Sequence, residues 1–69
     1  MERRSYRKQE LAQLYCPESS PANARKTLWR WMNYHPTLMR DLQLMNYNPA
    51  RKSFLRQEVD LIVSCLGEP

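Results

Sequence analysis

One predicted helix carries a face of side chains suited to contact with nucleic acid. Asn23, Lys26, Arg30 and Asn33 share this face at helical spacing, and Arg25 flanks it. Lysine and arginine neutralise phosphates, and asparagine and arginine can form hydrogen bonds with base edges in the major groove. The pattern therefore indicates contact with duplex DNA. The alternative is a solvated helix face that keeps the chain soluble.

A second basic cluster precedes the first predicted helix and consists of Arg3, Arg4, Arg7 and Lys8. Residues 1–6 are predicted to form an extended arm. Basic arms of DNA-binding folds run along a phosphate backbone, so these four residues are included in the predicted nucleic-acid site. The alternative is a charged segment without fixed structure.

Trp29 lies at the solvent flank of the same basic helix. A large exposed indole on a monomer indicates a partner, and the alternative is that it packs beneath the first helix. Tyr34, Met39 and Leu44 also fall off the apolar stripes of their helices. These four residues are the predicted partner interface, either for a homodimer or for another protein.

The residue types give little support to catalysis or to metal binding. His35 is the only histidine and directly precedes a proline, which favours a role at a helix boundary. Cys16 and Cys65 are the only thiols, too few with one histidine for a structural zinc site. Glu10 and Glu58 are predicted in the first turns of two helices, where a carboxylate favours the helix dipole. We therefore expect no enzyme activity, cofactor, metal or small-molecule substrate.

Composition is typical of a small globular domain. The 69 residues are 42% hydrophobic and 26% charged, with one glycine and a net charge of +4. A chain of this length buries only about 60% of its unfolded surface, which allows one domain over residues 1–69 but no deep active site. We expect no leader and no membrane contact, because no long apolar run is present. Two cysteines without a disulfide framework fit the cytoplasm.

Prolines and capping residues divide the chain into helices. Ser20-Pro21 is the clearest start signal, since serine caps a helix and proline suits its first position. Cys16-Pro17 ends the preceding helix. Asn46 is expected to end the third helix in a left-handed conformation, with Tyr47 folding back onto its last turn. The predicted helices are Lys8–Tyr15, Pro21–Tyr34, Pro36–Met45 and Arg56–Leu66, the last followed by Gly67.

Apolar stripes predict the core. In the basic helix Ala24, Leu28, Trp31 and His35 are expected to share the inward face, with Met32 beside them. The stripes of the third and fourth helices are Leu38, Leu42 and Met45, and Val59, Ile62, Val63 and Leu66.

The remaining segments are short. Arg4–Tyr6 and Ser53–Leu55 each enter a helix in extended form and can pair as a minimal two-stranded β-bridge. Arg51 and Lys52 are expected to be solvent-facing connectors. The predicted fold class is all-α, with four short helices, either alone or together with this bridge.

Two helices resemble a helix-turn-helix of the kind found in regulators and excisionase-like proteins. The resemblance rests on Glu10-Leu11-Ala12, Tyr15, Ser20-Pro21 and a basic helix carrying Trp31-Met32. It implies that the second helix is the recognition helix. The turn between the helices is about two residues longer than usual.

The whole chain also resembles a small bacterial domain-of-unknown-function family that occurs in gut anaerobes. The matching residues are Tyr6, Lys8, Glu10-Leu11-Ala12, Tyr15, Pro17, Trp31, Leu38, Leu42, Tyr47 and the ending Leu66-Gly67-Glu68-Pro69. Leu55-Arg56 stands where this family tends to carry Thr-Pro, so Ser53 is the remaining candidate to cap the last helix. The family implies no activity.

Together these patterns predict a DNA-binding accessory or regulatory protein that docks by electrostatic contact. Lys26 and Arg30 are expected on phosphates, with Asn23 and Asn33 nearer the bases. The alternative function is a protein–protein interaction module or homodimerising adaptor that binds no nucleic acid.

Overall fold

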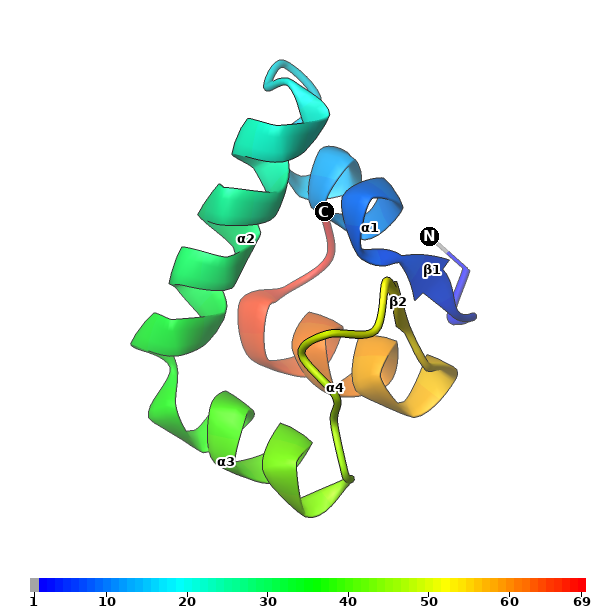
Figure 1. The fold of residues 1–69 in the computed structure, drawn as a ribbon, viewed down its shortest axis with the longest axis vertical. Coiled ribbons are helices and arrows are strands. Elements are labelled where there is room, and N and C mark those ends of the chain that lie inside the picture. Colours follow the sequence, from blue (N-terminus) through cyan, green and yellow to red (C-terminus); the bar gives the residue numbers. More distant parts are fainter. Residues whose placement is uncertain (1) are drawn as a thin grey trace.

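A computed structural model describes residues 2–69, which form four helices and one pair of short strands (Figure 1). This mostly helical fold with a minimal β-pair confirms the predicted fold class. Met1, the first residue of the predicted arm, lies outside the described residues. The elements are β1 (Tyr6–Arg7), α1 (Lys8–Tyr15), α2 (Pro21–Tyr34), α3 (Pro36–Leu44), β2 (Ser53–Phe54) and α4 (Arg56–Leu66).

The start of α2 is fixed by residues that suit its unpaired backbone donors. Ser20 Oγ accepts a hydrogen bond from the Asn23 backbone N–H at 3.3 Å. Pro21 takes the first helical position, where its missing N–H removes no bond. Pro17 follows the last turn of α1 and stops that helix at Tyr15. The predicted bounds of α1 and α2 are therefore confirmed.

His35 joins α2 to α3, and its ring caps the second of these helices. The Nδ1 atom accepts a hydrogen bond from the Leu38 backbone N–H at 3.3 Å, and Pro36 takes the first position of α3. The ring thus occupies the helix boundary, as the sequence predicted.

The end of α3 follows the predicted pattern but comes earlier. The helix ends at Leu44, and Asn46 then adopts a positive φ of 60°. The Tyr47 backbone N–H donates to the Leu42 carbonyl at 3.0 Å, so the chain folds back over the last turn. The prediction that Met45 belongs to the buried stripe is wrong: it is 39% exposed, because the helix has ended before it.

The two strands bring distant parts of the chain together. They are antiparallel, with Tyr6 opposite Phe54 and Arg7 opposite Ser53. The predicted bridge between these segments is confirmed, although the first strand begins two residues later and ends one residue later than expected. Both aromatic side chains of the pair are buried, so the strands attach the start of the chain to the core.

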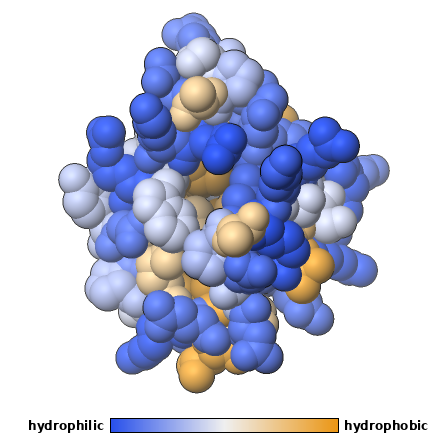
Figure 2. Space-filling view, in the orientation of Figure 1, coloured by the Kyte–Doolittle hydropathy of each residue, from blue (hydrophilic) through white to orange (hydrophobic). Residues whose placement is uncertain are grey.

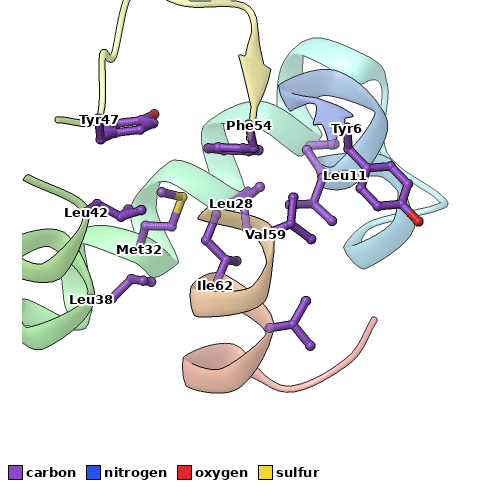
Figure 3. Close-up of a cluster of buried hydrophobic side chains, with 13 residues drawn as sticks. Tyr6, Leu11, Leu28, Met32, Leu38, Leu42, Tyr47, Phe54, Val59 and Ile62 are labelled. Atoms are coloured by element: carbon purple, nitrogen blue, oxygen red, sulfur yellow. The ribbon is translucent and has the colours of Figure 1, made fainter. Parts of the chain in front are cut away.

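The core lies where the four helices meet the strand pair (Figure 3). Each element contributes a short apolar stripe, and the aromatic rings of Tyr47 and Phe54 cover one side. The buried apolar residues are Tyr6, Leu11, Ala12, Ala24, Leu28, Met32, Leu38, Leu42, Tyr47, Phe54, Val59, Ile62 and Val63.

The prediction that Trp31 points into the core is wrong. Its side chain is 38% exposed and lies against Tyr15 of α1, with the ring centroids 6.1 Å apart and nearly perpendicular. The inward stripe of α2 is instead Ala24, Leu28 and Met32, which follow one another at four-residue intervals. Trp31 lies to one side of that stripe, at the edge where an amphipathic indole can keep its N–H in water.

A buried ion pair fixes the start of α4. The Leu55 backbone N–H donates to Glu58 Oε1 at 2.8 Å, and Arg51 Nη2 binds both carboxylate oxygens at 2.6 and 2.7 Å. Ser53 does not cap this helix, which has no side-chain cap at Leu55. The expectation that Arg51 is a solvent-facing connector is wrong, because Glu58 is 1% exposed and holds the guanidinium against the domain.

The helices are arranged so that α2 forms one long side of the domain (Figure 1). α1 packs more extensively against α2 than any other pair of elements does, and α3 follows α2 at its C-terminal end. α4 contacts both α2 and α3. The outward face of α2 is left uncovered by these neighbours, since Lys26 and Arg30 are exposed.

Candidate functional site

The outward face of α2 holds the residues predicted to contact nucleic acid. Asn23, Lys26, Arg30 and Asn33 are all exposed, as is Arg25 beside them. α2 contains three cations and no carboxylate, a charge of +3 in a chain whose net charge is +4. The charge excess of the protein is therefore concentrated on one helix.

Four cations elsewhere in the chain lie beside carboxylates, unlike those of α2, whereas Arg7, Lys8, Lys52 and Arg56 form no ion pair within residues 2–69. Within residues 2–69, Arg25, Lys26 and Arg30 form no ion pair. A cation without a local counter-charge keeps its attraction for an external anion. The paired cations are Arg3 with Asp60 and Glu68, Arg4 with Glu2 and Glu10, Arg40 with Asp41, and Arg51 with Glu58.

The predicted basic arm is folded against the domain. Arg3 lies 3.2 Å from the Asp60 carboxylate of α4. The Arg4 guanidinium lies 3.9 Å from the centre of the Tyr6 ring and 3.5 Å from Glu10. Arg3 and Arg4 are thus engaged within the molecule, whereas Arg7 is exposed and forms no ion pair among the described residues.

Lys8 contacts the segment that follows α3 and lines the same cleft as α2. Its Nζ donates to the Pro49 carbonyl at 2.8 Å and lies 4.7 Å from the centre of the Tyr47 ring. Burial lowers the pKa of the Lys8 ammonium, and the charges of Arg51 and Arg25 lower it further against the opposing effect of Glu58. The structure therefore brings one residue of the N-terminal cluster to the flank of the α2 site.

A cleft of about 360 Å³ lies along this flank. One wall is α2, and the other is formed by Lys8 and the segment 47–54. On this face hydrophobic atoms are visible between hydrophilic side chains (Figure 2). The lining residues are Lys8, Ala22, Arg25, Lys26, Leu28, Trp29, Met32, Tyr47, Pro49 and Phe54.

Six of the lining residues were absent from the predicted site: Ala22, Leu28 and Met32 of α2, and Tyr47, Pro49 and Phe54. Tyr47, Pro49 and Phe54 lie on either side of the turn between α3 and β2, far in sequence from α2. The available signal was two aromatic residues flanking an Asn-Pro turn, but only the tertiary fold places them in the same cleft as Trp29. Arg25 and Lys26 line the cleft and also belong to the predicted site.

The side-chain amide of Asn33 already forms one hydrogen bond within α2. Its side-chain amide Nδ2 donates to the Trp29 carbonyl at 2.7 Å. The Oδ1 oxygen and the second amide hydrogen stay available for an external group. The Asn23 side chain forms no hydrogen bond within residues 2–69, although its backbone N–H is held by Ser20.

The predicted partner residues lie in different environments. Tyr34 and Leu44 are 77% and 78% exposed. Trp29 is 43% exposed and lines the cleft. Met39 is half-buried and packs against the core cluster. Tyr34 and Leu44 are therefore the two members with most of their apolar surface in water.

The two cysteines lie away from the α2 face, against the core. Cys16 and Cys65 are free thiols, half-buried against the core. Within residues 2–69 no three His, Cys, Asp or Glu side chains come close enough to hold one metal ion. No helix in the same range has the length and apolar character needed to cross a membrane.

The fold and its surface define a small, mostly helical domain with a basic helix beside an aromatic cleft. The chain belongs to the family described as Domain of unknown function (DUF4248), which matches residues 2–69. The predicted resemblance to an uncharacterised domain family is thereby confirmed. Comparison with curated proteins and comparison with solved structures each gave no match.

Proposed function

We propose that the protein binds duplex DNA through the outward face of α2, as a small accessory or regulatory protein. The observation that carries the proposal is the charge of this helix: Arg25, Lys26 and Arg30 are exposed, no carboxylate lies in α2, and none pairs with them in residues 2–69. Contacts to phosphates dominate the affinity of proteins for DNA.

In this proposal α1 and α2 act as a helix-turn-helix-like pair. Their close packing and the short connection over residues 16–20 support it. A helix about 10–12 Å across fits the major groove, which is about 12 Å wide. Lys26 and Arg30 then contact phosphates, and Asn23 and the free groups of Asn33 face the base edges.

Equilibrium binding of duplex DNA at several salt concentrations tests this proposal. Each cation that touches a phosphate contributes about 0.9 to the slope of log K against log salt. Lys26→Ala and Arg30→Ala should therefore each lower the slope by about one unit. Arg40→Ala on α3 is the matched control, because it removes the same charge from a different helix. Absence of binding at low salt, or an equal slope change for Arg40→Ala, would end the proposal.

A second candidate function is association with a protein partner. Tyr34 at 77% exposure and Leu44 at 78% are the observations that favour it, because large apolar side chains this exposed are typical of contact surfaces. Sedimentation at several concentrations distinguishes the two functions. A stable dimer that is lost in Tyr34→Ser or Leu44→Ser, together with absence of DNA affinity, would support this second function.

A further inference from the structure

The cleft beside α2 has the size and lining of a ligand site. Its volume of about 360 Å³ falls within the range of about 300–1,000 Å³ that small-molecule pockets occupy. Leu28 and Met32 contribute apolar surface, and the rings of Trp29, Tyr47 and Phe54 also line it. Aromatic rings on several sides suit a flat, unsaturated ligand.

Tyr47 and Phe54 form an aromatic part of the cleft lining. Tyr47 is only 9% exposed, and its Oη is buried without a hydrogen-bond partner within residues 2–69. Figure 3 shows this ring beside Phe54, with the hydroxyl directed to the Phe54 side. The two rings are nearly parallel, with centroids 6.1 Å apart. Because Oη has almost no accessible surface even in the empty cleft, a ligand in the cleft would contact the Tyr47 ring and not its hydroxyl.

The positive charge of the cleft favours an anionic ligand. Lys8, Arg25 and Lys26 all line it, and within residues 2–69 none of them pairs with a carboxylate. Burial lowers the pKa of the Lys8 ammonium, and the nearby charges of Arg51 and Arg25 lower it further, against the opposing effect of Glu58. A bound anion would relieve this repulsion.

We propose that the cleft binds one unstacked nucleotide, with its base against Trp29 and its phosphate between Arg25 and Lys26. A nucleotide joins a flat base to an anionic phosphate, which matches the two chemistries of the cleft. The inference rests on the proposed function, since it assigns to the α2 surface a preference for unpaired nucleotides. The nucleotide is either free or part of a single strand.

Fluorescence of Trp29 tests the proposal in the full chain. Trp31→Phe leaves Trp29 as the only indole, and the probes are thymidine 5′-monophosphate, an oligothymidylate strand, the same strand with abasic sugars, and a blunt duplex. We expect the oligothymidylate to quench Trp29 and to bind at least tenfold more tightly than the abasic strand. Equal binding of the two strands without quenching would overturn the proposal.

Two variants identify the residues responsible. Trp29→Ala should weaken oligothymidylate binding about tenfold and leave the salt slope for duplex DNA unchanged. Tyr47→Phe keeps the ring and removes only the inaccessible hydroxyl, so it is the matched control and should leave the affinities for both strands unchanged. Unchanged oligothymidylate affinity in Trp29→Ala would refute the stacking contact.

The probes also distinguish failure of this inference from failure of the proposed function. Quenching by the monophosphate or the strand, without affinity for the duplex, supports the cleft and refutes the duplex proposal. Duplex binding with equal affinity for the two strands supports the proposed function and refutes the cleft. Binding of the monophosphate alone identifies a free nucleotide as the source, and absence of all binding refutes both.

Discussion

Removal of the Glu58 carboxylate tests how α4 is anchored to the domain. The side chain is 1% exposed, binds Arg51 through both oxygens and accepts the Leu55 backbone N–H. Loss of one member of a buried ion pair costs about 3–5 kcal/mol. Because the Arg51 side chain is itself 31% exposed, we expect Glu58→Ala to cost about 3 kcal/mol, the lower end of that range. A domain of this size is stable by only about 3–10 kcal/mol in total.

Urea unfolding followed by circular dichroism measures this loss, and Glu10→Ala provides the matched control. Glu10 holds the equivalent position in α1, where it accepts the Arg7 backbone N–H at 3.3 Å. It is exposed and lies 3.5 Å from Arg4, so its removal should cost less than about 1 kcal/mol. Replacing both buried partners, Arg51→Met with Glu58→Leu, should cost less than Glu58→Ala. Equal losses for the two alanine variants would refute the reasoning.

Two further predictions concern Tyr47 and Gly67. Burial, with a smaller contribution from Glu58, raises the pKa of Tyr47 to about 12. The folded state therefore favours the neutral phenol, so this stabilisation is complete below about pH 10, the ordinary tyrosine pKa, and is lost as the pH rises to about 12. The free energy of unfolding should fall over that interval in the wild type, and Tyr47→Phe should remove this part of the decline. Gly67 has φ 85° and ψ 168°, a region that only glycine enters readily. Gly67→Ala should therefore cost about 1 kcal/mol and lower the melting temperature by about 4–8 °C; an unchanged melting temperature would show that the end of α4 relaxes freely.

Local signals in the sequence were sufficient to predict the helices. Ser20-Pro21, His35-Pro36 and Asn46 act on the few backbone groups next to them, so their effects can be predicted without knowledge of the fold. The structure confirms each of these boundaries within one residue. The short bridge between the segments of Tyr6 and Phe54 was also predictable, because each is an extended entry to a helix.

Features that depend on contacts between elements could not be predicted from the sequence patterns. On a helical wheel of α2 alone, Trp31 falls on the inward face. Its contact with Tyr15 depends on where α1 packs, which the wheel does not show. In the sequence Arg51 is indistinguishable from a solvent-exposed loop cation. Only the folded structure shows that it binds Glu58. The residues on the outward face of α2 could be predicted from helical spacing. The cleft could not, because Tyr47 and Phe54 come near α2 only through tertiary packing.

The pairing of Tyr6 with Phe54 has a consequence for the order of events during folding. The helices acquire their hydrogen bonds within a few residues, whereas the strands must meet after most of the polypeptide has closed into a loop. The entropy lost in that closure grows with the logarithm of loop length, and contacts distant in sequence slow folding. The two-residue ladder is therefore expected to form late, so a substitution at Phe54 would accelerate unfolding more than it slows refolding.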